Sequence, residues 1–163
     1  ARFAERPFTV GYAKSSTLPA RDGVPHGTIQ RSSKAPNNSF FRHWISTDDS
    51  ITWDIEVGQT GMYEATVHYT CAEGDVGAHM YLRCEGDNPD ATETRVTEAF
   101  DPPLYDKAKE RVEDSHYIVK DFKPLKMDGP IKLEKGRSVL RLRALQITGW
   151  QAIDVHSIEL VRK

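Results

Sequence analysis

Two residues near the C-terminus have the side chains that a sugar-stacking site needs. Trp150 and Gln151 follow each other in the loop before the last predicted strand. An indole presents a flat apolar face to a pyranose ring, and an amide can hydrogen-bond to the hydroxyl groups around it. Tyr105, in a long loop after Pro103, is a second candidate for stacking. The alternative for Trp150 is that it folds back over the edge of the fold and covers the core.

A second candidate site lies in the first quarter of the chain, where basic residues gather among turn formers. Its members are Arg21, His26, Arg31, Lys34 and Arg42, with Asn37 and Asn38 as amides for hydroxyl groups. Arginine donates paired hydrogen bonds to an oxyanion, so this set would suit a sulfated glycan. The alternative is that these residues are solvated charges, or ion-pair partners of Asp22, Asp48 and Asp49 that fix the N-terminal segment or face another domain.

The chain contains none of the common catalytic motifs. It has no Gly-x-Ser-x-Gly nucleophile elbow, phosphate-binding glycine loop, Cys-x-x-Cys or His-Glu-x-x-His sequence. The six histidines are scattered, without the spacing of transition-metal ligands. Spacing alone does not establish a glycosidase-like pair among carboxylates such as Asp48 and Asp75. We therefore predict a domain without catalytic residues.

The composition indicates one globular domain. The chain has 163 residues, of which 38% are hydrophobic and 28% charged, and its formal net charge is -2. This length can enclose a core, and no apolar run approaches the roughly 20 residues of a membrane span. The net charge gives no overall attraction to nucleic acid. The chain begins at Ala1 without a signal peptide, which indicates a processed product or a domain cut from a longer protein.

The spacing of apolar residues predicts strands. Apolar and polar side chains alternate from Ile51 to Val57 and again from Tyr63 to Cys71, which is the period-two pattern of half-buried strands. Pairing Val57 with Tyr63 across the intervening glycine turn places both apolar faces on one side, so we expect an antiparallel hairpin. A third strand, ending at Cys84, is expected to extend the hairpin to a meander.

The same register predicts part of the core. Trp53, Tyr63 and Tyr69 fall on the inner faces and are expected to be buried. Cys71 and Cys84 share a face but lie several residues out of register, whereas the Cα atoms of a disulfide must lie within about 7 Å. We therefore expect two reduced, buried thiols.

Further strands follow from the same alternation, and no helix of any length is predicted. The strands cover 39–45, 92–99, 118–122, 131–134, 139–145 and 153–161, with short extended pieces over 8–12 and 27–32. The strand over 92–99 is polar and is expected at a sheet edge. The apolar side of the last strand changes parity near 156–157, which predicts a β-bulge.

The order of these elements predicts an all-β jelly-roll sandwich of two antiparallel sheets, because many short strands are separated by turns. We expect a single domain over 1–163. It would have an irregular N-terminal approach over 1–38, a sandwich core over 39–163 and a long surface loop over 101–115.

The middle and the end of the chain resemble family 6-like carbohydrate-binding modules, which are jelly rolls of the galactose-binding-like class. The resemblance is carried by Gly58-Gln-Thr-Gly-Met-Tyr63, Leu133-Glu-Lys-Gly136, Val139-Leu-Arg-Leu142 and Ala152-Ile-Asp154-Val155. It implies a sugar site among the loops that include Trp150. It also implies a structural Ca²⁺ held by Asp154, although the usual pair of N-terminal carboxylates is missing here.

A resemblance over nearly the whole chain is to the accessory domain that follows the catalytic domain in bacterial sulfatases of the N-acetylgalactosamine-6-sulfatase type. It is carried by Arg6-Pro-Phe-Thr-Val-Gly11, Leu18-Pro-Ala-Arg-Asp-Gly-Val-Pro-His26, Trp44, Thr47-Asp-Asp49, His68-Tyr-Thr-Cys71, Val96-Thr-Glu-Ala-Phe-Asp-Pro-Pro-Leu104 and Val119-Lys-Asp-Phe122. The resemblance implies a non-catalytic module of an exported, polysaccharide-degrading enzyme, extracellular or periplasmic. The chain departs from the family pattern at Ala72, where proline is usual, and at Trp150, where a basic residue is usual nearby.

Two functions agree with these features. The first is a carbohydrate-binding module for an extracellular polysaccharide, either neutral or sulfated. The second is a structural accessory domain that packs on the sulfatase catalytic domain of the same polypeptide and has no ligand affinity of its own. Trp150 discriminates between them, because it should be exposed among polar loop residues in a binding module and buried or part of a large apolar patch in a packing domain.

Overall fold

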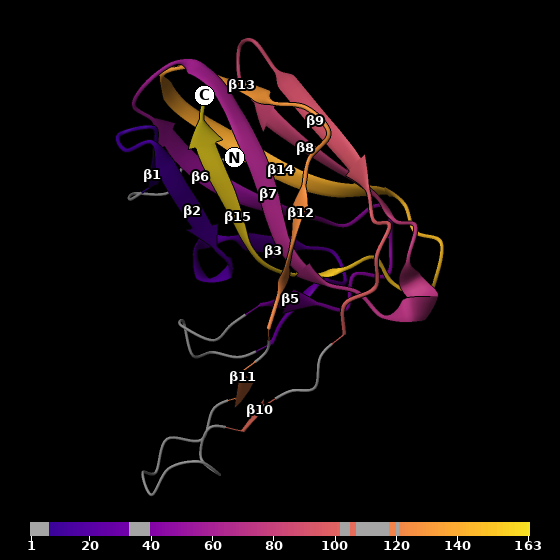
Figure 1. Cartoon of the computed structure of the whole chain (residues 1–163). Helices are drawn as coiled ribbons and strands as arrows, with labels where there is room; N and C mark the ends of the chain where they lie inside the picture. Colours follow the sequence, from indigo (N-terminus) through magenta and orange to yellow (C-terminus); the bar gives the residue numbers. More distant parts are fainter. Residues whose placement is uncertain (1–6, 33–39, 102–104, 107–117, 120) are drawn as a thin grey trace, which may run out of the picture.

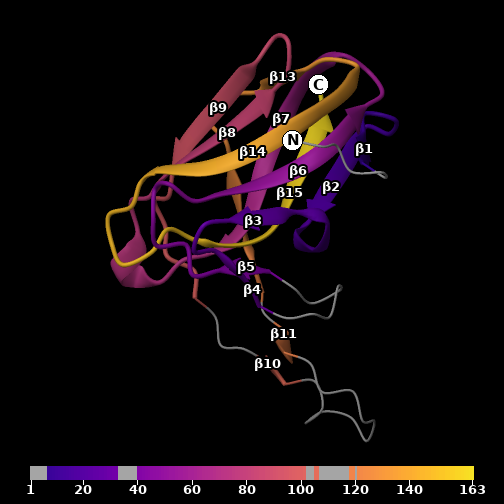
Figure 2. The ribbon, with the colours of Figure 1, turned by 180° about the vertical axis from the view of Figure 1, so that it is seen from behind.

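The computed structural model describes residues 7–32, 40–101, 105–106, 118–119 and 121–163. Two β-sheets pack face to face with the hydrophobic core between them (Figure 1 and Figure 2). The predicted all-β sandwich is therefore confirmed. Two short 3₁₀ turns, η1 (Ala20–Asp22) and η2 (Glu73–Asp75), are the helical elements of the described part, and no helix there has the length and apolar character needed to cross a membrane.

The first sheet has six strands in the order β1-β6-β14-β8-β9, with β3 also paired to β6. β1 runs parallel to β6, and the other neighbours are antiparallel. The sheet contains the polar edge strand that the sequence predicts, although it ends at Arg95 instead of Ala99. The strands are β1 (Phe8–Val10), β3 (Val24–His26), β6 (Ser50–Val57), β8 (His79–Glu85), β9 (Asp90–Arg95) and β14 (Gly136–Gln146).

The second sheet has seven strands in the order β12-β7-β15-β5-β4, with β13 on β7 and β2 on β15. The register of β15 against β7 shifts between Val155 and Ser157, which confirms the predicted bulge. The strands are β2 (Ser15–Pro19), β4 (Gln30–Arg31), β5 (Phe41–Arg42), β7 (Gly61–Thr70), β12 (Lys123–Lys126), β13 (Ile131–Leu133) and β15 (Asp154–Arg162). Two further short strands, β10 (Tyr105–Asp106) and β11 (Ile118–Val119), pair only with each other.

The predicted hairpin of β6 with β7 is wrong. β6 pairs with β14 in the first sheet, and β7 pairs with β15 in the second, so the turn between them carries the chain across the sandwich. The meander is wrong as well, since β8 pairs with β14 and β9. Strands that pair side by side and strands that face each other across a core both direct their apolar faces to one interior, so alternation alone does not separate the two cases.

The predicted aromatic core is confirmed. Trp53, Tyr63 and Tyr69 are buried, and the polar tip of each donates a hydrogen bond to a backbone carbonyl. Each side chain therefore contributes a large buried apolar area without leaving a polar group unsatisfied. The two cysteines are also buried and unpaired, as predicted. Cys71 directly follows β7 of the second sheet and Cys84 lies in β8 of the first, so the prediction of two reduced, buried thiols is correct although the strand pairing used for it is wrong.

The N-terminal segment is more regular than the sequence indicated. β1 and β4 fall within the predicted extended pieces, while β2 and β3 were missed. β2 buries a single large side chain, Leu18, and β3 contains Pro25, so neither shows an alternating pattern. β12 was missed for a related reason, because it holds Pro124 and lies at the sheet edge where proline is tolerated. Within the strand expected over 39–45, Phe41–Arg42 forms β5. The strand ends there because His43 has a φ of 63°, which is not an extended conformation.

Candidate functional site

The loop between β14 and β15 exposes Trp150 at one end of the sandwich. The residue is 67% exposed, so the alternative in which it covers the core is wrong. Its backbone N–H donates to Asp75 Oδ1 over 2.8 Å, and the N–H of Gln151 donates to the same oxygen over 3.4 Å. Gly149 lies so close to η2 that a Cβ there would be 2.3 Å from the Gly74 carbonyl oxygen. The backbone on both sides of the indole is therefore fixed while the ring itself faces outward.

His43 is the aromatic neighbour of Trp150, and the sequence did not single it out for this site. The two rings meet edge to face, with centroids 5.7 Å apart and an interplanar angle of 70°. The strained backbone of His43 is held by Thr28, whose carbonyl lies 3.0 Å from His43 Nδ1 and whose hydroxyl donates to the His43 carbonyl. A positive φ at a non-glycine residue has no signature in a single sequence, so this partner could not be foreseen.

Gln151 does not join Trp150 on the outer surface. Its side-chain amide donates to Asp154 Oδ1 over 3.4 Å, and Thr70 Oγ1 donates to Asp154 Oδ2 over 3.3 Å. Gln151 is only partly exposed and Asp154 is buried at the start of β15. The side chain of Gln151, which the sequence predicted to contact a sugar, thus hydrogen-bonds to Asp154 at the start of β15.

Asp154, the predicted calcium ligand, lies near another buried aspartate. Asp75 and Asp154 both act on Cys71, whose pKa rises to about 11, first through burial and then through these negative charges. Within the described ranges, no group of three or more histidine, cysteine, aspartate and glutamate side chains is arranged to hold a metal ion. Calcium binding therefore stays a prediction from the resemblance.

Arg31 of the basic N-terminal set has an internal role. Its guanidinium donates to the carbonyl oxygens of Ala20 (2.6 Å) and Gly23 (2.7 Å). The same group lies 4.8 Å from the centroid of the buried Phe41 ring, which adds a cation–π contact. Arg31 therefore holds the η1 turn on the second sheet, and its donors face protein atoms instead of a ligand.

The other described members of this set are spread over both sheets. His26 lies on β3 of the first sheet with Nε2 2.8 Å from the Thr52 hydroxyl, whereas Arg42 is exposed on β5 of the second. Arg21 on η1 pairs with its neighbour Asp22 at 3.7 Å. Lys34, Asn37 and Asn38, and the side chain of Tyr105, lie outside the described residues. Of the described members, Arg31, His26 and Arg21 therefore have partners within the protein, and Arg42 is exposed.

A groove that the sequence did not reveal crosses the outer face of the first sheet, over β6, β14 and β8. Its volume is about 630 Å³. A smaller hollow of about 280 Å³ continues it toward β9 and shares Tyr81 and Arg83 with it. The groove is lined by Asp48, Ser50, Tyr81, Arg83, Glu85, Arg141, Arg143 and Leu145.

Three arginines converge in this groove. Arg141 is directly opposite Arg83 across the β14–β8 pair, and Arg143 is opposite Tyr81. Arg141 is fixed, because its Nε donates to Glu85 Oε2 (3.0 Å) and a terminal nitrogen donates to Ser50 Oγ (2.8 Å). Arg83 and Arg143 are exposed, and among the described residues neither forms an ion pair.

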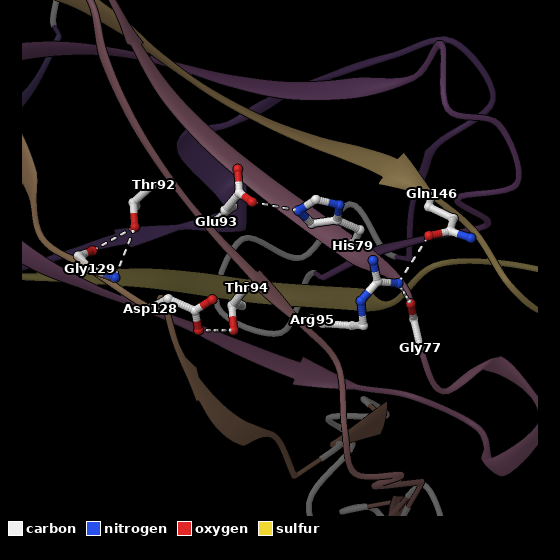
Figure 3. Close-up of polar contacts among 9 residues, drawn as sticks. All are labelled: Gly77, His79, Thr92, Glu93, Thr94, Arg95, Asp128, Gly129 and Gln146. Carbon is white, nitrogen blue, oxygen red and sulfur yellow. Dashed lines mark hydrogen bonds and ion pairs between the residues drawn. The ribbon is translucent and has the colours of Figure 1, made fainter.

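The same sheet face has paired polar groups next to the groove, near β9 (Figure 3). His79 Nε2 lies 3.1 Å from Glu93 Oε1, and Arg95 donates to the Gly77 carbonyl (2.8 Å) and to Gln146 Oε1 (3.0 Å). Their partners satisfy these groups within the protein. Among the described residues of this face, the arginines without a hydrogen-bond or ion-pair partner therefore lie in the groove.

The inner side of β9 fixes this edge to the second sheet. Thr92 Oγ1 donates to the Gly129 carbonyl (2.6 Å), and Thr94 Oγ1 donates to Asp128 Oδ1 (2.8 Å), as Figure 3 shows. Both acceptors lie in the connection between β12 and β13. The strand beside the groove is therefore held on both of its faces.

Neither the models of protein families nor the curated proteins contain a match to this chain. Solved structures do match, and carbohydrate-binding modules of families 35, 6 and 36 are among them. A family 35 module from Clostridium thermocellum is 13% identical, and the alignment covers 93% of this chain and 100% of the module with a TM-score of 0.60.

Two larger proteins contain a similar domain. In the Podospora anserina GH26-CBM35 β-(1,4)-mannanase the alignment covers 92% of this chain and 28% of that one, with 14% identity and a TM-score of 0.57. In the Cry4Aa toxin of Bacillus thuringiensis it covers 96% and 25%, with 11% identity and a TM-score of 0.62. Likeness at these identities shows the fold, which is the jelly-roll sandwich that carbohydrate-binding modules share.

Proposed function

We propose that this chain is a non-catalytic carbohydrate-binding domain that uses Trp150 as a stacking platform. The observation that carries the proposal is an indole that is 67% exposed on a loop whose backbone is held by Asp75 and Gly149. A large aromatic ring in water gives up hydrophobic stabilisation that a stacked sugar would restore. A prearranged backbone also lowers the ordering cost of binding.

The surroundings of Trp150 suit a sugar better than a protein partner. His43, whose ring meets the indole edge to face, carries in Nε2 a nitrogen donor or acceptor for a hydroxyl group. Most other residues next to Trp150 along the chain are polar or small, as the sequence Thr148-Gly149 before it and Gln151-Ala152 after it shows. Polar groups around one aromatic platform are typical of sugar sites.

The domain is proposed to work as part of a larger, extracellular protein that degrades a polysaccharide. The mannanase, of which a similar domain makes up about a quarter, supports attachment to a catalytic domain. The sequence resemblance described above favours a sulfatase as that enzyme.

Affinity gel electrophoresis of the chain on a panel of neutral and acidic polysaccharides tests the proposal. The variants are Trp150→Ala and, as a matched control, Tyr12→Ala. Tyr12 is 66% exposed and follows β1 at the opposite end of the sandwich, where Val10 pairs with Val57. We expect Trp150→Ala to weaken retention on at least one neutral glycan by about tenfold, equivalent to about 1.4 kcal/mol, and Tyr12→Ala to retain it.

If Trp150→Ala and Tyr12→Ala are retained equally strongly on every glycan, Trp150 is not part of the sugar-binding site. Absence of retention on every glycan would contradict the proposal and leave the structural accessory function.

A further inference from the structure

We propose that the groove on the outer face of the first sheet is a second ligand site, which binds a carboxylate or sulfate group of an acidic polysaccharide through Arg83 and Arg143. The polysaccharide part of this inference rests on the proposed function, whereas the anion selectivity rests on the groove alone. None of the ligand-binding residues predicted from the sequence lines this groove.

The strand register places the arginines as a cluster. Arg141 and Arg143 point to the same side of β14 because they are two residues apart, and Arg83 faces Arg141 from β8. Arg83 and Arg143 are therefore diagonal neighbours, about 7–8 Å apart at their Cα atoms. Long guanidinium side chains from these positions can reach a single oxyanion.

Charge in the groove is unbalanced. Three guanidinium groups line it against the carboxylates of Asp48 and Glu85, although the whole chain has a net charge of -2. Glu85 is engaged with Arg141, and Asp48 forms no ion pair with Arg143 among the described residues. Like charges directly opposite in a sheet repel each other, so the arrangement is stabilised when an anion enters. Arginine suits this role because its planar fork matches an oxyanion with paired hydrogen bonds.

The lining favours a sugar acid over other anions. Tyr81, half-buried beside the arginines, and Leu145, which is exposed, provide aromatic and apolar surface that the C–H face of a sugar ring can cover. The volume of about 630 Å³ falls in the usual range of small-ligand sites, about 300–1,000 Å³. A nucleic acid would be expected to need a wider basic surface than three arginines in an acidic chain.

Two pairs of polymers with a common backbone test the site. Dextran sulfate against dextran isolates the sulfate group, and polygalacturonate against its methyl ester isolates the carboxylate. We expect the full chain to be retained by at least one anionic polymer much more strongly than by its neutral twin, with retention that falls as salt rises. The pair that gives the difference identifies which anion the site takes.

Single substitutions then locate the site. Arg83→Gln and Arg143→Gln should each weaken retention on the anionic polymer by about tenfold, and Arg143→Lys should weaken it severalfold because it keeps the charge but loses the paired donors. Arg95→Gln is the matched control, since it removes the same charge from the same sheet face at a residue with partners of its own. Arg95→Gln should change retention less than twofold.

Three results would overturn the inference. They are absence of retention on both anionic polymers, equal losses for Arg83→Gln and Arg95→Gln, and equally strong retention of a DNA duplex. The inference and the proposed function fail separately, because neutral-glycan binding should depend on Trp150 and not on Arg83. Near-identical melting temperatures would show that the variants remain folded.

Discussion

Two groups of arginines in this protein differ in what their side chains contact. Arg31 lies in the basic N-terminal segment that the sequence marks as a binding candidate, and its guanidinium is used by two carbonyl oxygens and the Phe41 ring. Arg83 and Arg143 lie at strand positions where the alternation already predicts a polar residue, so they attract no notice in the sequence, and among the described residues they have no ion-pair partner. Arg31, which the sequence marks because basic residues cluster around it, thus stabilises the fold. Arg83 and Arg143, which are distant in the sequence and are brought together by strand pairing, are the better candidates for ligand binding.

The difference follows from the physics of guanidinium groups. A turn-rich segment leaves carbonyl groups without regular partners, and an arginine nearby satisfies them. A regular sheet already pairs its backbone groups, so arginines on its outer face find partners among neighbouring side chains or in the loops at the sheet ends. On β9 such partners exist, and in the groove Arg141 takes Glu85 and Ser50. Exposed arginines on a sheet are therefore the better candidates for ligand contacts.

The largest effect in this comparison is expected for Arg31→Ala. The variant loses two charge-assisted hydrogen bonds and the contact with Phe41, each bond being worth at most about 1.5–3 kcal/mol net of the exchange with water. We expect the free energy of unfolding, measured by urea denaturation, to fall by about 2–4 kcal/mol. Below its unfolding transition the variant should bind the anionic polymer normally.

Arg42→Ala on the adjoining β5 is the control for this prediction. Arg42 is exposed, so its removal should change the unfolding free energy by no more than about 0.5 kcal/mol. A selective loss of anion binding in Arg31→Ala, without a loss of stability, would reverse the roles given to the two groups.

The sequence predicts the fold better than it predicts strand pairing. Alternation correctly located β6, β7, β14 and β15 and placed Trp53, Tyr63 and Tyr69 in the core, because burial on one face leaves a period of two whatever the partner strand. It failed on the pairing of β6 with β7, since the direction of the turn between them is not encoded in alternation. Short or proline-containing strands such as β2, β3 and β12 leave no periodic signal at all.

The candidate sites show the same division. For Trp150 the sequence left two outcomes open, exposure on the loop or cover over the core, and the structure shows exposure. The groove could not be found, since it requires knowing that β14 lies between β6 and β8. Only that order sets Arg141 opposite Arg83 and Arg143 opposite Tyr81.

Alkaline pH should lower the stability of the domain through Cys71, which lies near the Trp150 loop and not in the groove. Cys71, which neighbours Asp75 and the Trp150 loop, has its pKa raised to about 11 by burial and nearby carboxylates, whereas an exposed thiol titrates near 8.5. The native state therefore holds this proton more tightly, so stability is intact below about pH 8.5 and falls by roughly 2–3 kcal/mol as pH rises toward 11. Arginines stay charged throughout.

Denaturation with urea at pH 8 and pH 10.5 measures this effect. The decline should be smaller in Cys71→Ala, which has no thiol to ionise at this position. A wild-type decline that persists unchanged in Cys71→Ala would assign the pH effect to other groups.

Glu85→Gln should produce a moderate effect of opposite sign on binding and on stability. The change breaks the ion pair with Arg141, which costs about 0.2–1 kcal/mol of stability for a partly exposed pair. It also releases a third guanidinium in the groove, so retention on the anionic polymer should strengthen by about two- to fivefold. Glu93→Gln, on the same sheet face but paired with His79, is the control, and an equal gain there would show that only net charge matters.

The smallest effect is the most direct test of whether Arg83 and Arg143 are unpaired. Without ligand, Arg83→Gln removes a charge directly opposite Arg141, so it should leave stability unchanged or raise it by about 0.5 kcal/mol. Arg95→Gln loses hydrogen bonds to Gly77 and Gln146 instead and should lower stability by about 0.5–1 kcal/mol.

The gain in Arg83→Gln should disappear in 1 M salt, where screening acts over about 3 Å, while most of the loss in Arg95→Gln should persist. If both variants lose stability alike at low salt, Arg83 has a partner in the folded protein. Arg83 would then stabilise the fold as Arg95 does, and the claim that the groove arginines are available for an anion would be wrong.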